Sequence, residues 1–528
     1  MIYRLTFIFV SMILIATLLL LAQRWPNLNW AWLIFAPIFL TGLHDLLQRK
    51  HTILRIYPVI GHFRYVFESY RTELQQYFVE SDLDGKPISR EFRSLAYQRA
   101  KKDDDTRSFG TIFDVYRDGY EWLNHSLAPT NCKDCDLRIN IGGPACTKPY
   151  SASPLNISAM SFGALSRNAV MALNRGAKLD NFSHNTGEGG ISPWHLKHGG
   201  DLVWQIGTGY FGCRNSQGEF DTDLFEKSAA LEVVKMIEIK LSQGAKPGHG
   251  GMLPAAKLTK EIAAIRLVPM GEDVLSPPGH SAFSSPKGLL EFVAKLRDLS
   301  GGKPVGFKLC LGNKREFLSI CKAMQETGIM PDFITVDGGE GGTGAAPVEL
   351  TNSVGMPLRD ALRFVHNALR GIDVRDQIKI IAAGQVFSAF HILRLVALGA
   401  DAVNSARGMM LALGCIQSRR CNTDKCPTGI TTQNPARYKQ LDITDKGARV
   451  ANYHHSTLGA LAELLNILGL RRLSDMQPQY INRRINQGIV MSYEELYPCH
   501  PTGFLLDNNK IPEDWQQHWH LANAVSWQ

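Results

Sequence analysis

The sequence predicts an α/β protein, a TIM (β/α)8 barrel that follows an N-terminal transmembrane helical hairpin and a small helical linker region. From about residue 149 onward, short apolar runs that end in glycine, serine or asparagine alternate with helical patterns. This alternation is typical of parallel strands joined by right-handed crossovers. No G-x-G-x-x-G motif follows a strand and opens a helix near its start, which favours a closed barrel over a doubly wound sheet.

The composition is that of a globular protein. The chain has 528 residues, of which 45% are hydrophobic and 20% charged, and this length holds one large barrel with extensions. The formal net charge of +8 is modest, and no tract of lysine and arginine occurs with interleaved aromatic residues. We therefore expect no nucleic-acid partner.

The first 48 residues predict a two-helix membrane anchor. Residues 5–22 carry no charge and are long enough to cross a bilayer as a helix, and a second apolar run follows at residues 30–43. A cleaved signal peptide and a pair of buried soluble helices are the alternatives. No small-residue cleavage site precedes a polar mature start, and two such runs at one terminus favour the anchor.

The charges flanking the apolar runs predict the orientation of this anchor. Three basic residues follow the second run, against one in the short loop between the runs: Arg49, Lys50 and Arg55, against Arg24. Basic residues stay on the cytoplasmic side, so we expect a protein of the inner (cytoplasmic) membrane whose catalytic domain lies in the cytoplasm. In this reducing compartment, clustered cysteines are more often metal ligands than disulfides.

The remaining chain divides by its texture. Residues 49–148 are charged and mixed, and predict a mostly helical linker or lid. Residues 149–440 carry the barrel pattern, and residues 441–528 predict a C-terminal helical extension. The linker contains a C-x-x-C motif, Cys132 and Cys135, and a third cysteine, Cys146. These three cysteines either bind a second metal ion or simply pack within the fold.

Within the barrel region, individual strands and helices can be assigned in order. Strand patterns end in polar or glycine-rich loops, and helical patterns follow several of them directly. Predicted strands or strand ends are 155–160, 304–310, 332–337, 378–383 and 401–405, and predicted helices include 161–180, 314–328 and 388–400. In such a barrel the chemistry lies in the loops at the carboxyl ends of the strands.

Three successive strand ends predict a phosphate site. Residues 337–344, "DGGEGGTG", contain five glycines in eight positions, so the backbone can approach a ligand and direct N–H groups at an anion. Residues 382–385 and 404–408 follow the next two strands, and Arg407 adds a positive charge. The glycines could instead serve only tight turns, but three such loops in succession favour ligand binding.

The loop 415–426 predicts an iron–sulfur cluster. Cys415, Cys421 and Cys426 lie within twelve residues, and basic side chains separate them. Structural zinc usually needs four ligands, and a disulfide would leave one thiol over. A three-iron cluster needs only three thiolates, and nearby cations offset its negative charge. The alternative is a structural loop with incidental cysteines.

The motifs "ISAMSFGALS", "NTGEGG", "QGAKPGHGG", "DGGEGGTGAAP" and "LGCIQSRRCNTDKCPTGITTQNP" occur in this order. Together they closely resemble the FMN and iron–sulfur (synthase) domain of glutamate synthase, over about residues 151–435. The resemblance implies a stand-alone, membrane-anchored relative with FMN and a [3Fe-4S] cluster. It also implies reduction of 2-iminoglutarate, formed from 2-oxoglutarate and ammonia, to L-glutamate, with Cys415, Cys421 and Cys426 as cluster ligands.

The resemblance also implies catalytic residues. Lys246 and Arg266 would hold the two carboxylates of 2-oxoglutarate, since a guanidinium fork suits a carboxylate. Glu188 and Gln243 would orient the imine for hydride transfer. His249 stands where the family has an acid, and we expect it to act as a proton donor or a substrate contact.

The same resemblance implies the flavin contacts. The loop that begins at Met160 would lie against the isoalloxazine, Lys308 near flavin N1, and the later glycine loops around the phosphate. The implied cofactor-binding residues are Met160, Ser161, Gly163, Asn185, Lys308, Gly339, Gly342, Thr343, Gly344, Gly384, Ser405 and Arg407.

The partners follow from what the sequence lacks. No nucleophilic cysteine follows Met1 and no amidotransferase domain is recognisable, so we expect free ammonia or another amine donor. No nicotinamide-binding fingerprint occurs, so we expect electrons from ferredoxin or another electron-donor protein. The same fold and cofactors could serve another amine, as in an N-alkylglutamate-synthase-like enzyme, or an amino-acid oxidoreductase with a membrane electron acceptor. A non-catalytic electron-relay subunit is the third alternative.

Overall fold

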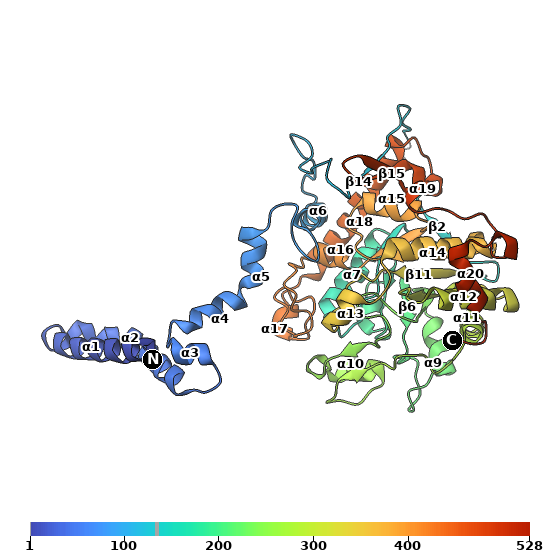
Figure 1. Cartoon of the computed structure of the whole chain (residues 1–528). Helices are drawn as coiled ribbons and strands as arrows, with labels where there is room; N and C mark the ends of the chain where they lie inside the picture. Colours follow the sequence, from blue (N-terminus) through green and yellow to red (C-terminus); the bar gives the residue numbers. More distant parts are fainter. Residues whose placement is uncertain (1, 132–136) are drawn as a thin grey trace. The chain divides into compact units, whose positions relative to one another are not determined.

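The computed structural model describes residues 2–131 and 137–528 (Figure 1). It consists of two compact units, Met1–Gly85 and Lys86–Gln528, and each is described by itself below. Cys132 and Cys135 of the possible second metal site lie outside the described residues. Cys146, the third cysteine of that group, is a free thiol whose Sγ lies 3.3 Å from the carbonyl oxygen of Gly302.

The first unit is helical throughout. Two of its segments, Tyr3–Arg24 and Pro26–Leu47, are long and apolar enough to cross a membrane by length and composition, and most of their side chains are exposed within the unit. Short helices follow the second segment. The helices are α1 (Ile2–Arg24), η1 (Pro26–Ala31), α2 (Trp32–Leu47), α3 (Thr52–Ile56), α4 (Gly61–Ser69), α5 (Arg71–Leu74) and η2 (Gln75–Val79).

The second unit contains a closed barrel of eight parallel strands, which confirms the predicted TIM barrel. Each strand pairs with the next one along the barrel, and the last pairs with the first through Asn404 and Asn156. The strands are β4 (Leu155–Ile157), β5 (His184–Asn185), β6 (Leu202–Ile206), β7 (Val234–Lys240), β10 (Val305–Leu309), β11 (Phe333–Asp337), β12 (Lys379–Ala383) and β13 (Ala402–Ser405).

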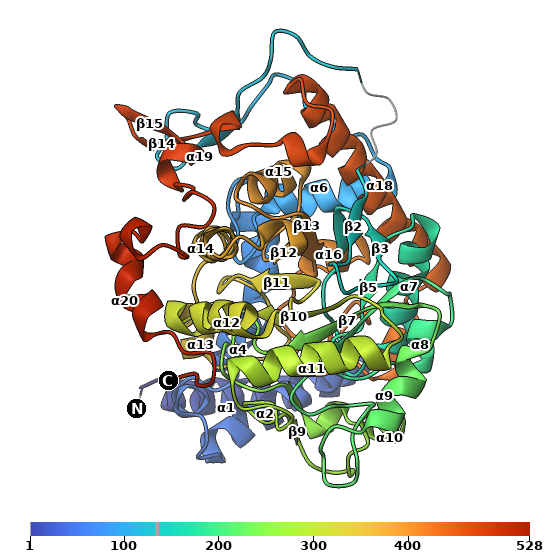
Figure 2. The same ribbon diagram turned by 90° about the vertical axis from the view of Figure 1, so that its right-hand side faces the viewer.

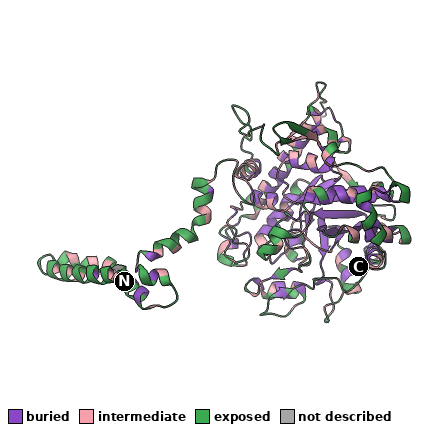
Figure 3. Ribbon diagram, viewed as in Figure 1, coloured by how far each residue is buried: buried purple, intermediate pink, exposed green. Residues whose placement is uncertain are grey.

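Helices surround these strands (Figure 2), and their outer sides face solvent while the strands are buried (Figure 3). Many of them begin at a serine, aspartate or asparagine whose side chain accepts from the first turn, as Ser166 accepts from Ala169 N. The main helices are α7 (Arg167–Leu179), α9 (Thr222–Ala229), α11 (Pro286–Leu299), α12 (Lys314–Thr327), α14 (Leu358–Gly371), α15 (Ala389–Ala397) and α18 (Ile443–Ile467), with the short helices α8 (Pro193–Leu196), α10 (Lys260–Arg266), α13 (Val348–Ser353), α16 (Arg407–Ala412) and α17 (Pro435–Tyr438).

A hairpin closes one end of the barrel. Strands β2 (Ile139–Ile141) and β3 (Tyr150–Ala152) pair antiparallel. Their apolar side chains form one cluster with residues near the amino ends of the barrel strands: Ile141, Tyr150, Ala152, Val203, Met236, Phe333, Ile381 and Ala402. This cluster fills the amino end of the barrel in the part of the chain that the structure describes, so we expect a ligand to enter from the carboxyl ends of the strands.

Further elements lie outside the barrel. A helix, α6 (Arg90–Lys101), contributes Ala96 and Ala100 to the main core. A three-stranded sheet joins β1 (Glu121–Leu123) to the hairpin of β14 (Ile481–Asn486) and β15 (Ile489–Ser492). The remaining elements are β8 (Met252–Leu253), β9 (Val274–Leu275), α19 (Tyr493–Leu496) and α20 (Glu513–Leu521). The C-terminal region, which we expected to be helical, thus also contains two strands.

Candidate active site

A buried carboxylate organises the barrel interior. Glu238 on β7 is 1% exposed and accepts three hydrogen bonds from residues on β5, β6 and β11. Asn185 Nδ2 and Gln205 Nε2 donate to its Oε1 at 2.8 and 2.7 Å, and Thr335 Oγ1 donates to its Oε2 at 2.5 Å. A buried charge persists only where such donors satisfy it. This network fixes the side chain of Asn185, which was predicted to bind the cofactor.

The network continues into the loop after β5. Asn185 Oδ1 accepts from Gly187 N at 3.0 Å, which shapes the "NTGEGG" turn. Gly187 has a φ of +63°, and a Cβ there would lie 2.6 Å from Ser161 N, so no larger side chain fits. The glycine therefore brings the loop after β5 against the loop after β4. Both loops carry predicted site residues, Glu188 in the first and Met160, Ser161 and Gly163 in the second.

Glu188 lies among three cationic side chains. Lys240 Nζ contacts Glu188 Oε1 at 2.8 Å, and both side chains are largely buried. Burial by itself would raise the pKa of Glu188, but the charges of Lys240, Arg266 and Lys246 hold this pKa below its ordinary value. Glu188 is therefore ionised at neutral pH. Lys240 neutralises it, which leaves the charges of Lys246 and Arg266 available to an anion.

Arg266, the last residue of α10, links this group to the loop after β4. Its guanidinium is 4% exposed and donates through Nη2 to Phe162 O at 3.2 Å and to Ser161 Oγ at 3.4 Å. It stacks on the Phe211 ring at 5.1 Å. Burial lowers its pKa to about 10, so the guanidinium remains charged at neutral pH. Its Nε is buried and has no hydrogen-bond partner among the described residues.

Lys308 and Asp337 form a second buried pair at the ends of β10 and β11. Lys308 Nζ lies 3.1 Å from Asp337 Oδ2, which also accepts from Gly244 N at 3.0 Å. Burial by itself would lower the pKa of Lys308, but the charges of Asp337 and Glu238 raise it. Lys308 is therefore a buried cation. Its pairing also fixes the start of the loop that contains Gln243.

The predicted phosphate loops meet around Glu340. Arg407 Nη2 and Gln385 Nε2 donate to Glu340 O at 3.0 and 3.4 Å. The Glu340 carboxylate accepts from Leu358 N at 3.0 Å, at the first turn of α14, where no residue caps the helix. A Cβ at Gly342 would lie 2.9 Å from Arg407 Nε. The guanidinium therefore lies directly against the glycine-rich backbone.

The other predicted residues of this region follow the same loops. Gln243 Nε2 donates to Thr343 Oγ1 at 3.3 Å, which joins the substrate loop to the glycine loop. Around Gly344, a Cβ would meet no atom within 4 Å, so the backbone there is open to a ligand. Gly339 and Gly384 both pack within the loop cluster. Ser405 differs from them, because its buried hydroxyl donates to Val386 O at 2.7 Å and is thus used within the fold.

His249 lies at the mouth of a small pocket. The pocket has about 10 Å³ of space, room for about one water molecule. His249 itself is exposed, and its Nδ1 lies 2.9 Å from Gly250 O. Glu188 and Lys240 line the pocket from the barrel side. The other lining residues are Thr208, Leu241, Ser242, Gly248, Gly250, Gly251, Pro277 and Pro278.

The three clustered cysteines follow α16 and are free thiols. Burial, and then the proximity of the other two sulfurs, raise the pKa of Cys415 to about 12, although Gln417 N donates to its Sγ at 3.4 Å. At Cys426 a contact with Thr428 and nearby backbone N–H groups outweigh burial and lower the pKa. Within residues 2–131 and 137–528, no three His, Cys, Asp or Glu side chains form a site for a metal ion. Cluster binding therefore stays a prediction.

Hydrogen bonds join the cysteine loop to the loop after β4. Gln433 Nε2 donates to Gly163 O and Leu165 O at 3.0 and 2.9 Å. Lys257 Nζ donates to Ala164 O and Cys421 O at 3.2 and 2.8 Å. One backbone segment therefore contacts Arg266 on one side and the cysteine loop on the other.

Sequence reasoning missed several of these residues: Gln205, Glu238, Lys240, Lys257 and Thr335. A signal for two of them exists, because Glu238 and Lys240 alternate with isoleucine in the buried strand "VKMIEIK". Charged residues at every second position of such a strand indicate a polar barrel interior. Lys257 gave no comparable signal, because a single lysine in a loop is usually exposed to solvent.

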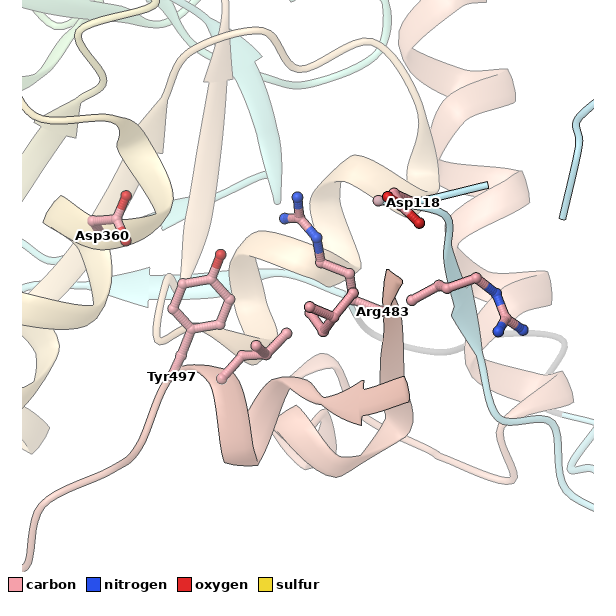
Figure 4. Close-up of a pocket in the computed structure, with 8 residues that line it drawn as sticks. Asp118, Asp360, Arg483 and Tyr497 are labelled. Carbon is pink, nitrogen blue, oxygen red and sulfur yellow. The ribbon is translucent and has the colours of Figure 1, made fainter. Parts of the chain in front are cut away.

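A larger hollow of about 500 Å³ lies between β14, α14 and α19 (Figure 4). Its two arginines are already engaged, since Arg483 Nη1 contacts Glu121 Oε1 at 3.3 Å and Arg484 Nε donates to Val115 O at 3.3 Å. Two aspartates, Asp118 and Asp360, also line it. We assign no ligand to this hollow.

Comparison with known proteins identifies the family. Residues 137–471 match a family described as a conserved region in glutamate synthase. The chain is 36% identical over 505 residues to the glutamate synthase large subunit-like protein YerD of Bacillus subtilis, covering 88% of this chain and 95% of the relative. It is 34% identical over 345 residues to an archaeal glutamate synthase [NADPH] of Methanocaldococcus jannaschii, covering 65% of this chain and 64% of the relative. The chain belongs to the glutamate synthase family.

Proposed function

We propose that this protein is an FMN- and iron–sulfur-dependent oxidoreductase of glutamate-synthase type, which reduces the imine of 2-oxoglutarate and ammonia to L-glutamate. The observation that carries the proposal is the charge of the candidate site. The charges of Lys240, Lys246 and Arg266 all act on the carboxylate of Glu188. After Lys240 pairs with Glu188, two cations remain. They match the two carboxylates of 2-oxoglutarate.

The two remaining cations have different tasks in this proposal. Arg266 binds one carboxylate through its guanidinium, whose buried Nε is without a partner among the described residues. Lys246 binds the other as a point charge. Because both are held by burial rather than in solvent, the substrate is bound in one orientation.

Glu188 acts on the nitrogen of the bound imine. An ionised carboxylate accepts a hydrogen bond from the imine N–H and favours the protonated imine, whose carbon is more electrophilic than that of the neutral imine. The low pKa of Glu188 keeps it in this accepting form. The Gln243 side chain, which already reaches Thr343, can turn toward the same nitrogen.

The residues at the strand ends fit FMN. Bound there, FMN supplies the hydride for imine reduction. The loop Met160–Gly163 would contact the ring system, and Lys308 would stabilise negative charge near N1. Arg407 and the open backbone around Gly344 would hold the phosphate. Asn185 is fixed in place by Glu238 and would hydrogen bond to the ring edge.

The electron route in the proposal runs through the cysteine loop. Cys415, Cys421 and Cys426 would hold a [3Fe-4S] cluster, and Gln433 and Lys257 tie this loop to the proposed flavin loop. A ferredoxin or another electron-donor protein supplies the electrons, and ammonia or another amine supplies the nitrogen. We further propose that α1 and α2 anchor the protein in the cytoplasmic membrane, with the barrel in the cytoplasm.

One observation favours a second candidate. His249 is exposed at the mouth of the small pocket, where the resemblance leads us to expect an acid. A histidine at this position removes one carboxylate that would bind ammonium, so a primary alkylamine competes more readily for the site. In that case the product is an N-alkylglutamate. The two functions differ only in the amine that forms the imine with 2-oxoglutarate, and it is this imine that reoxidises the reduced protein.

The proposal can be tested with anaerobically purified protein. We expect a flavin absorption spectrum, and an EPR signal of a three-iron cluster in the oxidised state. After reduction, 2-oxoglutarate with ammonium should restore the oxidised flavin spectrum. In the Lys246→Ala variant, the concentration of 2-oxoglutarate required for this reoxidation should be far higher. Reoxidation by 2-oxoglutarate with methylamine, but not by 2-oxoglutarate with ammonium, would support the second candidate. A preparation without flavin would contradict both.

A further inference from the structure

Helix α4 has an apolar side that no residue of its own unit covers. Ile60, just before the helix, is 69% exposed, and Phe63 and Phe67 are each 61% exposed. These positions are three and four residues apart, so their side chains form one continuous strip along the helix. Tyr70 extends the strip at 59% exposure. We call Ile60, Phe63, Phe67 and Tyr70 the α4 strip.

Two arginines flank the α4 strip. Arg64 and Arg71 each follow a strip residue by four positions, after Ile60 and Phe67, and both are exposed. Arg64 lies beside Ile60 on α4, and Arg71 begins α5 directly after Tyr70, so both adjoin the strip. Aromatic and aliphatic side chains on one side, with arginines beside them, are typical of a helix that lies in the headgroup region of a membrane. The long arginine side chains can reach phosphate groups above such a helix.

The structure fixes this helix to the two apolar helices. The Asp45 carboxylate near the end of α2 is fully buried and accepts from Val59 N and from His62 Nε2, both at 2.9 Å. The Tyr57 ring lies 4.7 Å from the ring of Tyr3, at the start of α1. Helix α4 therefore begins where α1 starts and α2 ends. If α1 and α2 span a bilayer, that point lies at its boundary.

We propose that the α4 strip is a membrane-surface site whose occupant is the phospholipid bilayer, with Arg64 and Arg71 contacting lipid phosphates. The proposal rests on the membrane anchoring by α1 and α2 proposed above. We choose the bilayer as the occupant because the strip adjoins the two apolar helices. If these helices span a bilayer, they place the strip at its surface. Tyr77, Phe78 and Val79 on η2 are further exposed apolar side chains of the same unit.

The test places a photoreactive p-benzoylphenylalanine at Phe63 of the full-length protein. The protein is reconstituted in vesicles of phosphatidylethanolamine and phosphatidylglycerol, illuminated, and digested for mass spectrometry. A matched control carries the same group at Glu68 on the same helix, about 100° around the axis from Phe67. A third variant carries it at Phe9, which is exposed on α1.

We expect lipid adducts at Phe63 in an amount similar to Phe9 and severalfold above Glu68. Adducts between Phe63 and a peptide of residues 86–528, or of a second copy, would overturn the proposal while leaving the anchor intact if Phe9 still reacts with lipid. Equal lipid labelling of Phe63 and Glu68 would also overturn it, because labelling would then not depend on the strip. Absence of lipid adducts at Phe9 would refute the anchor itself.

Discussion

Replacing Glu238 tests whether its hydrogen bonds or its charge hold the barrel interior together. In Glu238→Leu, the donors on Asn185, Gln205 and Thr335 lose their acceptor inside a buried space. A buried donor without a partner costs about 1–3 kcal/mol. Three such donors therefore lower the free energy of unfolding by at least about 3 kcal/mol.

Glu238→Gln separates the two explanations. The amide oxygen can still accept from both Asn185 and Gln205, which already share one carboxylate oxygen. The new amide donor faces Thr335, whose hydroxyl can rotate to accept it. The loss of charge weakens the bonds but also removes the cost of burying an ion. We therefore expect the free energy of unfolding to change by only about 1 kcal/mol.

Urea unfolding followed by circular dichroism measures both effects. Glu291→Gln, on the exposed side of α11, is the matched control and should stay within about 0.5 kcal/mol of the unchanged protein. An unfolding free energy for Glu238→Leu close to that of Glu238→Gln would refute the reasoning. It would mean that the three donors find other acceptors, and that the network does not position Asn185.

Three further predictions concern the site. Cys421→Ser should abolish the EPR signal of the cluster. The control Cys321→Ser, at a buried position of α12, should retain the signal. A cluster signal in Cys421→Ser would contradict the ligand assignment. Arg266→Lys should raise the KM for 2-oxoglutarate about tenfold or more, because a lysine cannot make the bidentate contact, and an unchanged KM in steady-state assays would place the carboxylate elsewhere. Burial lowers the pKa of His280 to about 4, below the ordinary 6.5 of an unfolded chain, so the unfolded state binds a proton first as the pH falls. Stability should fall by roughly 3 kcal/mol between pH 6.5 and 4 through this group, and His280→Gln should flatten the pH dependence of urea unfolding over that range.

The barrel was predictable because its signal is repeated. Each strand is a short apolar run, and the chain order of runs and helices admits few topologies. Strand β5 shows the limit of this reasoning, since only His184 and Asn185 form it and no run of apolar residues marks it. Its place follows from the barrel, which requires an eighth strand between β4 and β6.

The hairpin β14–β15 was not predicted, although its pattern is local. The sequence "INRRINQGIVMS" alternates only partly, and its strands are exposed at their ends. Its partner β1 lies more than 350 residues earlier in the chain. The two strands pair with Glu121 opposite Arg483. Pairing at such a distance leaves no trace in a local pattern. Composition alone therefore favoured a helical extension.

The candidate site was predictable where a motif fixes the backbone, and less so where a charge acts through another residue. Glu188 and Lys246 stand in glycine-rich motifs. Lys240 lies in a strand, and its role depends on the distance from its Nζ to Glu188, which only the folded structure gives. From the sequence we predicted that Lys246 and Arg266 act beside Glu188. The structure adds Lys240 as a third cation. The proposed substrate depends on the charge balance that results.

The loop after β4 joins the two halves of the proposed chemistry. The Phe162 carbonyl accepts from Arg266, and the next carbonyl, of Gly163, accepts from Gln433 beside the cysteine loop. The two carbonyls are joined through Gly163, whose φ of +105° a residue with a side chain rarely adopts. The conformation of Gly163 therefore holds the contact with Arg266 and the contact with Gln433 in place together.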